Sequence, residues 1–355
     1  MEIELYNHIV GAHYGELEID DSVIGQITEN TAETWQPDRE TNERGNNTEQ
    51  GKIAEEIVEQ FLRQFYANRI SSKSYDEIRN DGFTKHAPFD FLIWESGTAD
   101  IAPIEIAIQN DISSTPNQFV RLSEYTRRLC RQSNVKIVEV KSTKIREALK
   151  RDSGFNGDYD DQAEVIKLIN EIKRCDDVFC YPHFKRSDIA VNYSIDDYCQ
   201  YVKRQDGSLA NLTGEQLRRR VIDLEVTHQC SDIFVRVYLD QEQKRGFVIG
   251  WIQRERLLDY AVLFKKMVQR NKSERALYFA KNLSEVTGLD LIQQVFQNGQ
   301  QVYASPFTRT NFYHKRKDCT YIRGVADADL IVFESEEEAI TAGRYISRCR
   351  NCYED

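Results

Sequence analysis

The sequence predicts an α/β (α+β) protein with a mixed central sheet flanked by helices, followed by a small C-terminal metal-binding domain. Three observations lead to this prediction. An apolar stripe at helical spacing runs through residues 51–66, and short apolar strand candidates alternate with helices over residues 89–260. Two pairs of soft metal ligands occur after residue 310. A helix followed by mixed strands and helices is typical of a sheet covered by helices.

The length and composition favour a globular protein of the reduced cytoplasm. A chain of 355 residues accommodates one large domain and a small one, or two medium ones. Eight cysteines are too few for a disulfide framework. No apolar run is long enough for a membrane helix, and the opening MEIELYNHIVG lacks the pattern of a secretory signal. We therefore expect a cytoplasmic protein with no membrane partner.

The net charge of −11 is concentrated at the N-terminus. Residues 1–60 hold 15 acidic and 3 basic side chains, whereas the remaining residues hold 43 acidic and 44 basic ones. Residues 28–50 are polar and almost free of aliphatic side chains, which predicts a loop, and residues 1–27 offer short strand candidates. We expect residues 1–50 to form an acidic arm or cap, either solvated or lying over a binding surface.

The elements after residue 50 are predicted from periodicity. The helix over 51–66 has an apolar stripe of Ile53, Ala54, Ile57, Val58, Phe61, Leu62 and Phe65. Further helices are expected over 117–132 and 162–174, and a strand end passing into a helix over 250–270. Strands are expected, in chain order, over residues 89–94, 101–109, 135–142, 178–184, 222–226, 232–240 and 247–252.

Two of these strands carry residues suited to metal-assisted hydrolysis. Glu139 and Lys141 are two apart on a predicted strand, so both side chains project from one face. Asp90 lies on the strand over 89–94, between two phenylalanines that face the other way. Two carboxylates and an ammonium on neighbouring strands suit Mg²⁺, which prefers carboxylates, water and phosphate oxygens. Asp223 and Glu225 form a second carboxylate pair, for which a half-solvated strand is the favoured account.

These residues resemble the active site of the PD-(D/E)XK, or restriction-endonuclease-like, nuclease superfamily. The matching segments are Pro88-Phe89-Asp90 and Glu139-Val140-Lys141, preceded by a helix of the form Gly-x-x-Ala-Glu at Gly51, Ala54 and Glu55. The resemblance covers roughly residues 51–145. It implies that Asp90, Glu139 and Glu55 bind Mg²⁺ (or Mn²⁺), that Lys141 joins them in catalysis, and that residues 51–300 form the nuclease-like domain.

One departure from that pattern leaves an alternative open. The family usually separates the Asp from the Glu-x-Lys strand by a short hairpin, but 48 residues intervene here. Either they are an insertion, or Glu105 is the true partner of Asp90 and Gln109 or another group replaces the lysine. We favour Glu139, because the lysine accompanies it.

The C-terminal segment holds the pattern of a closed zinc site. His314 and Cys319 form the first pair of ligands, and Cys349 and Cys352 the second. With a capping box at Ser335 to Glu338, residues 301–355 resemble the metal-binding domain of the Ada type. Because the first pair is His and Cys, we expect a structural or DNA-contacting site; a methyl-accepting repair sensor is the lesser alternative. A second zinc site is less favoured, at Cys175, Cys180, His183 and Cys199.

Together these patterns predict a Mg²⁺-dependent DNA endonuclease, with restriction or anti-phage defence implied by the resemblance alone. Double-stranded DNA is the expected partner of the zinc domain, through Tyr313, Lys315, Arg316, Lys317, Tyr321 and Arg323. The alternative is a non-catalytic DNA- or protein-binding protein that keeps an inactive nuclease fold. Whether the chain acts as a monomer or a homodimer stays open.

Overall fold

The computed structural model divides the chain into two compact units, residues 1–292 and 293–355, which are described separately below. It describes residues 1–6, 8–15, 17, 21–30, 41–116, 120–180, 195–228, 230–254, 262–269, 272–297, 302–306, 311–314, 319, 321–326, 329–333, 339–340, 342 and 347–349. Within these residues no helix is both long and apolar enough to cross a membrane.

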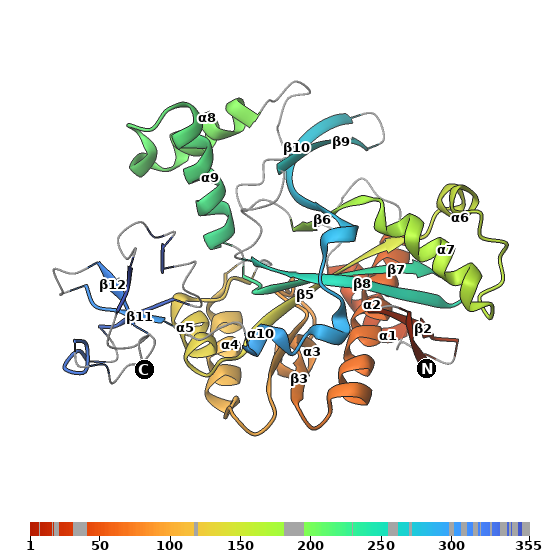
Figure 1. Ribbon diagram of the computed structural model, residues 1–355, viewed down its shortest axis with the longest axis horizontal. Helices are drawn as coiled ribbons and strands as arrows, with labels where there is room; N and C mark the ends of the chain where they lie inside the picture. The colour runs from red at the N-terminus through yellow and green to blue at the C-terminus, as the bar shows by residue number, and fades with distance from the viewer. Residues whose placement is uncertain are drawn as a thin grey trace. The chain divides into compact units, whose positions relative to one another are not determined.

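A seven-stranded mixed sheet forms the centre of the first unit (Figure 1). Its order is β1-β2-β8-β7-β5-β4-β3, and all neighbours are antiparallel except the parallel pair β5 and β7. The predicted α+β class with a mixed sheet is therefore confirmed. The strands are β1 (Glu2–Tyr6), β2 (Ile9–His13), β3 (Ile70–Ser74), β4 (Phe91–Glu95), β5 (Lys136–Lys144), β7 (Ile233–Asp240) and β8 (Arg245–Gln253).

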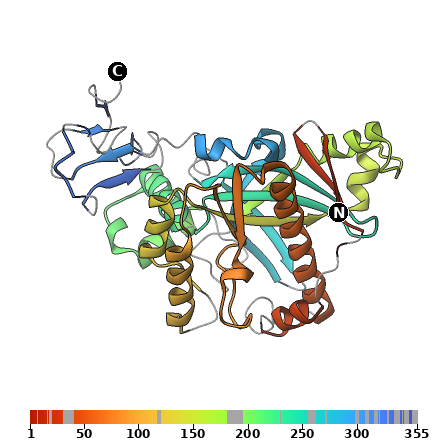
Figure 2. The ribbon, with the colours of Figure 1, turned by 90° about the horizontal axis from the view of Figure 1, so that it is seen from below.

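Helices cover both faces of this sheet (Figures 1 and 2). Ile104 and Ile108 of one helix pack with Leu92 of β4 in one hydrophobic cluster, and Leu168 of another packs with Phe234 of β7 in a second. Every residue of β7 is buried, as expected for a central strand covered on both faces. The helices are α1 (Asp21–Asn30), α2 (Thr41–Tyr66), α3 (Tyr75–Ile78), α4 (Ala102–Ser114), α5 (Glu124–Gln132), α6 (Glu147–Ser153) and α7 (Gln162–Lys173).

Two smaller substructures complete the first unit. A three-stranded sheet has the order β6-β10-β9, from β6 (Asp176–Cys180), β9 (Val262–Gln269) and β10 (Lys272–Asn282). Helices α8 (Ile195–Gln205) and α9 (Gly214–His228) pack through a cluster of their own that contains Tyr198, Val202 and Leu217. Short 3-10 helices occur at η1 (Gly207–Leu209), η3 (Leu283–Glu285) and η4 (Leu289–Leu291).

The N-terminal region is not a separate arm. Strand β2 pairs with β8, so β1 and β2 form one edge of the central sheet. The prediction of a loop over 28–50 is also wrong at both ends of that range. Helix α1 continues to Asn30, and helix α2 already begins at Thr41. A helical extension that faces solvent needs no apolar stripe, so its polar sequence resembles that of a loop.

Three predicted elements after residue 100 are corrected. Residues 102–109 belong to helix α4, which buries Ile104, Ala107, Ile108 and Ile112 at helical spacing and has Pro103 in its first turn. Residues 222–226 belong to α9, so Asp223 and Glu225 lie on a helix, and Glu225 is fully buried against the Tyr198 hydroxyl. Residues 262–269 form strand β9, paired with β10, where a helix was expected.

The described part of the second unit contains short strands and the short helix α10. Strands β11 (Val302–Ala304) and β13 (Ile331–Phe333) are antiparallel, and β12 (Phe312–Tyr313) pairs with β14 (Ser347–Arg348) in parallel. Helix α10 spans Gln294–Gln297. His314 follows β12 directly in the sequence. Two backbone hydrogen bonds of 2.7 Å join it to Tyr303 of β11. The capping box expected at Ser335 to Glu338 lies outside the described residues.

Candidate functional site

Asp90 lies directly before the first residue of β4 and is held by backbone hydrogen bonds to β5 and to the start of α3. Its backbone N–H donates to the carbonyl of Val138 at 3.0 Å, and its carbonyl accepts from the N–H of Tyr75 at 2.8 Å. Its side-chain Oδ2 accepts a hydrogen bond from the backbone N–H of Val140. Val140 lies between Glu139 and Lys141 on β5, so the structure brings the three sequence-predicted residues together.

Glu139 and Lys141 form an ion pair through Oε1 and Nζ. Their side chains are 23% and 21% exposed, so the pair is half-buried and remains open to solvent on one side. The Ser231 hydroxyl, from the segment before β7, donates to Glu139 Oε2 at 3.4 Å. An ammonium beside a carboxylate in a half-buried position can offset added negative charge, such as that of a phosphate.

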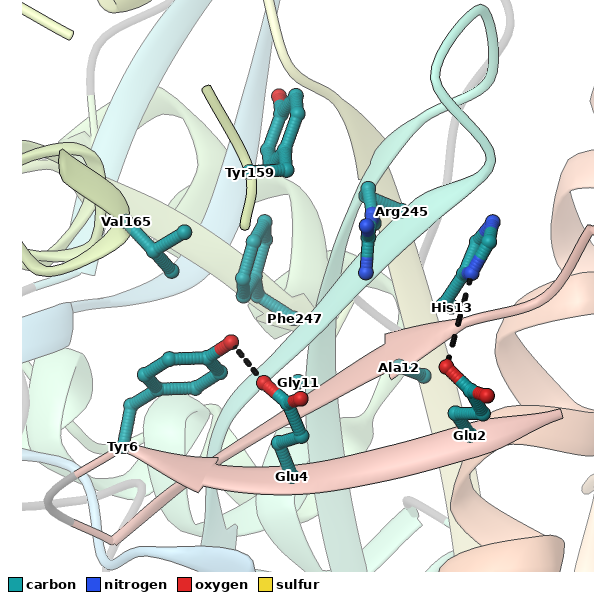
Figure 3. A pocket seen from close by; sticks show the side chains of 10 residues that line it. All are labelled: Glu2, Glu4, Tyr6, Gly11, Ala12, His13, Tyr159, Val165, Arg245 and Phe247. Carbon is teal, nitrogen blue, oxygen red and sulfur yellow. Dashed lines mark hydrogen bonds and ion pairs between the residues drawn. The ribbon is translucent and has the colours of Figure 1, made fainter. Parts of the chain in front are cut away.

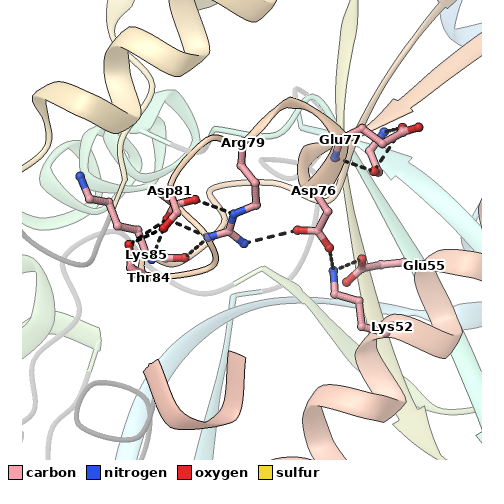
Figure 4. A network of polar contacts seen from close by, with 9 residues as sticks. Lys52, Glu55, Asp76, Glu77, Arg79, Asp81, Thr84 and Lys85 are labelled. Carbon is pink, nitrogen blue, oxygen red and sulfur yellow. Dashed lines mark hydrogen bonds and ion pairs between the residues drawn. The ribbon is translucent and has the colours of Figure 1, made fainter. Parts of the chain in front are cut away.

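Glu55 reaches this region from helix α2. The predicted stripe is buried at Ile53, Ala54, Ile57, Val58, Phe61 and Leu62, although its last member, Phe65, is 47% exposed. Glu55, at the edge of the stripe, is half-buried. Lys52 Nζ lies 2.7 Å from Glu55 Oε2 and 2.7 Å from Asp76 Oδ2, so one lysine bridges two carboxylates (Figure 4).

The bridge continues into a buried network in the loop after α3 (Figure 4). Arg79 contacts Asp76 Oδ1 at 3.3 Å and Asp81 Oδ1 at 2.7 Å, and it donates to the Lys85 carbonyl at 2.6 Å. Arg79 and Asp81 are almost fully buried. Burial opposes the ionised form of Asp81, but the Arg79 guanidinium and backbone donors hold the pKa of Asp81 below its ordinary value. The network therefore fixes Asp76, and through it Lys52.

The three carboxylates of the site interact electrostatically. Burial, followed by the charges of Glu55 and Glu139, raises the pKa of Asp90 well above its ordinary value, while Lys141 partly offsets the rise. Burial also raises the pKa of Glu55, against the opposing effect of Lys52. A cation among these oxygen donors would relieve the repulsion, and the donor set is the kind that Mg²⁺ or Mn²⁺ prefers. The residues present fit such an ion.

The carboxylates of Asp90, Glu139 and Glu55 lie farther from one another than the histidine and cysteine ligands of the second unit do. Among the residues that the structure describes, one group of three has all its potential ligand atoms within 4.8 Å of one another, and it is His314, Cys319 and Cys349. Glu139 is instead directed to Lys141 and Glu55 to Lys52.

The alternative assignment of Glu105 is not supported by its position. Glu105 lies in the first turn of α4, and its Oε1 is 2.7 Å from Lys73 Nζ. Gln109, the suggested substitute for the lysine, donates to the Ile78 carbonyl at 2.9 Å. Both side chains stabilise the contact of α4 with β3 and α3. The 48 residues between Asp90 and Glu139 include β4, α4 and α5.

Sequence reasoning missed Lys52, Asp76 and Ser231. The contact of Lys52 with Glu55 could have been predicted from the sequence, because residues three apart on a helix lie side by side. No sequence pattern predicts the contacts of Asp76 and Ser231, because only the tertiary fold brings these residues to the site.

His314, Cys319 and Cys349 form a buried cluster in the second unit. His314 Nδ1 lies 3.2 Å from Cys319 Sγ, and the two sulfurs are 3.8 Å apart. That separation is too long for a disulfide. Burial lowers the pKa of His314, which favours the neutral imidazole that binds metals. The cluster is able to hold a metal ion. The fourth predicted ligand, Cys352, lies outside the described residues.

The other residues singled out in the sequence are dispersed. Tyr313 is buried, whereas Tyr321 and Arg323 are exposed. Lys315, Arg316 and Lys317 lie outside the described residues. Cys180 and Cys199 are buried in different hydrophobic clusters, which argues against a second zinc site; His183 is not among the described residues.

A small pocket at the β1–β2 edge is not a substrate site (Figure 3). Its volume of about 10 Å³, between Tyr6, Tyr159, Phe247 and Arg245, has room for about one water molecule.

Comparisons with protein-family models, with curated proteins and with solved structures find no match for this chain.

Proposed function

We propose that this protein is a Mg²⁺-dependent (or Mn²⁺-dependent) deoxyribonuclease with the restriction-endonuclease-like fold of the PD-(D/E)XK superfamily. The hydrogen bond from the Val140 N–H to Asp90 Oδ2 carries the proposal, because it joins the isolated Asp to the Glu-x-Lys strand. The mixed sheet flanked by helices, and Glu55 on helix α2 just before strands β3, β4 and β5, agree with that family.

Each residue of the site has a distinct role in this proposal. Asp90 and Glu139 would hold the metal ion together with Glu55. The ion would lower the pKa of a water molecule and offset charge on the scissile phosphate. Lys141 would orient that water and offset phosphoryl charge from its half-buried position. Lys52 keeps Glu55 oriented and offsets the charge of Asp76.

The metal of the second unit is proposed to be zinc, bound by His314, Cys319, Cys349 and Cys352. A tetrahedron with Zn–S bonds of about 2.3 Å separates two sulfurs by about 3.8 Å, which is the separation of Cys319 and Cys349. We assign this zinc a structural role in a small domain that assists binding of double-stranded DNA through exposed Arg323 and the neighbouring basic residues. A cytoplasmic role in restriction or anti-phage defence belongs to the same proposal, on family resemblance alone.

The direct experiment is cleavage of plasmid DNA with and without Mg²⁺ or Mn²⁺, by wild type and by Glu139→Gln. Metal-dependent cutting by wild type alone supports the proposal. DNA binding without cutting by either protein would replace it with the non-catalytic alternative.

A further inference from the structure

A pocket of about 450 Å³ lies between helices α1 and α2, away from the proposed active site. Its volume is in the range of small-molecule sites. The apolar part of its wall consists of Tyr14, Leu17, Ile24 and Ile53. None of Asp90, Glu139, Lys141 or Glu55 lines it, so a ligand here is independent of the proposed nuclease activity.

Thr28 supplies a polar group that this pocket leaves unsatisfied. The residue is 5% exposed, and its Oγ1 is buried without a hydrogen-bond partner among the described residues. Thr28 lines the pocket. Burying a hydroxyl without a partner is unfavourable, so a polar atom of a ligand is the expected partner.

Two helical glycines keep the pocket open. Gly25 of α1 and Gly45 of α2 both line it, and a Cβ added at either position would meet nothing within 4 Å. Glycine within a helix is less favourable than alanine or leucine. Since packing does not require glycine at either position, the missing side chains leave space for a ligand.

The charges around the pocket favour a cation. Among the described residues that line the pocket, Asp21, Glu29 and Glu49 contribute three carboxylates and Lys244 contributes one ammonium. Lys244 Nζ lies 6.0 Å from the centre of the Tyr14 ring. Acidic groups around apolar side chains suit a molecule with ammonium ends and a methylene stem, whereas a phosphate or carboxylate ligand would be repelled.

We propose that this pocket binds a free organic amine of the polyamine class, with its stem against Ile24 and Ile53 and an ammonium donating to Thr28 Oγ1. Titration calorimetry of the full chain with spermidine is the test. Saturable binding at one site per chain is expected. Gly25→Leu should weaken this binding at least about tenfold, because the new side chain occupies the pocket while the charge stays the same.

Gln26→Leu is the matched control, since it places the same side chain at an exposed neighbouring position of α1 that does not line the pocket. It should bind spermidine as wild type does. Leucine favours a helix more than glycine does, so Gly25→Leu is expected to melt no lower than wild type, and its loss of binding would not reflect unfolding.

Two further variants locate the amine. Thr28→Val should weaken binding about five- to tenfold through loss of one hydrogen bond to a charged donor. Glu139→Gln should leave binding unchanged, because its carboxylate is outside the pocket. The proposal is overturned if wild type shows no saturable binding, if Gly25→Leu binds as tightly as wild type, or if Glu139→Gln abolishes binding.

Discussion

Asp90 and Val140 are joined by a hydrogen bond from the backbone N–H of Val140 to the carboxylate of Asp90, across 50 positions of sequence. Strands β4 and β5 are antiparallel neighbours despite the long segment between them, with Phe91 opposite Val138. The helices α4 and α5, which lie between the two strands in the sequence, pack beside them. Asp90 and the pair Glu139–Lys141 are thereby set on adjacent strands, as in a short hairpin.

The charge of half-buried Asp90 is expected to cost stability at neutral pH. Because its pKa is raised in the folded chain, the folded state binds this proton more tightly than the unfolded state does. The free energy of unfolding should therefore fall as pH rises from the ordinary carboxyl range through the raised pKa. Asp90→Asn removes the charge and keeps the acceptor for the Val140 N–H.

At pH 7, without divalent ions, Asp90→Asn should melt about 2–5 °C above wild type by calorimetry. The difference should shrink toward about pH 4, where the wild-type carboxyl is protonated. A variant that melts below wild type at pH 7 would show that the Asp90 charge is stabilising.

Lys52 is expected to stabilise the site through two carboxylates at once. Lys52→Met removes the partner of Glu55 and of Asp76 and should lower the free energy of unfolding by about 2 kcal/mol in urea titrations. Arg174→Met is the control, since Arg174 forms an i,i+3 pair with Glu171 but is 78% exposed. Its effect should stay within about 0.5 kcal/mol. Equal effects of the two substitutions would argue against the bridging role.

Metal in the second unit is expected to depend on Cys319. Cys319→Ala should reduce bound zinc, measured by elemental analysis, and should make residues 293–355 sensitive to protease, because metal binding is coupled to folding in small domains. Cys199→Ala, at a buried cysteine in the cluster of α8 and α9, should keep its zinc. Equal zinc content in both variants would contradict the proposed ligand set.

Glu105 is expected to be dispensable for DNA cleavage. Its carboxylate is directed to Lys73, so Glu105→Gln should change the rate of Mg²⁺-dependent cleavage by less than about twofold, while weakening one half-buried ion pair. A loss as large as that of Glu139→Gln, measured in the same gel assay, would reinstate Glu105 as the partner of Asp90.

The class of fold could be predicted from the sequence because, in long segments, the spacing of apolar residues fits either a helix or a strand but not both. The apolar stripe of α2 fits only the helical period, and the alternation in β5 fits only the strand period. β5 lies close to its predicted range, and α2 contains the predicted helix over 51–66 but begins earlier, at Thr41. The spacing of apolar residues over 101–109 fits both a strand and a helix. Ile104, Ile106 and Ile108 alternate as in a strand, whereas Ile104, Ala107 and Ile108 have helical spacing. The structure buries Ile104 and Ile108 but leaves Ile106 59% exposed, as a helix requires.

The sequence was less informative about the surroundings of the site. Asp90, Glu139 and Lys141 could be selected by motif, but Asp76 contacts Lys52 across 24 positions and Ser231 contacts Glu139 across 92. Such contacts depend on how helices and strands pack, and no local pattern encodes them. The edge position of β1 and β2 was missed for the same reason, because pairing with β8 spans almost the whole first unit.

The most direct test of the account is the metal-dependent cleavage of plasmid DNA by wild type and Glu139→Gln, with Glu105→Gln as the matched control. We expect wild type and Glu105→Gln to cut with Mg²⁺ or Mn²⁺ and not with EDTA, and Glu139→Gln to cut at least about 100-fold more slowly. Wild type that leaves modified and unmodified DNA uncut with either ion would contradict the proposed nuclease activity.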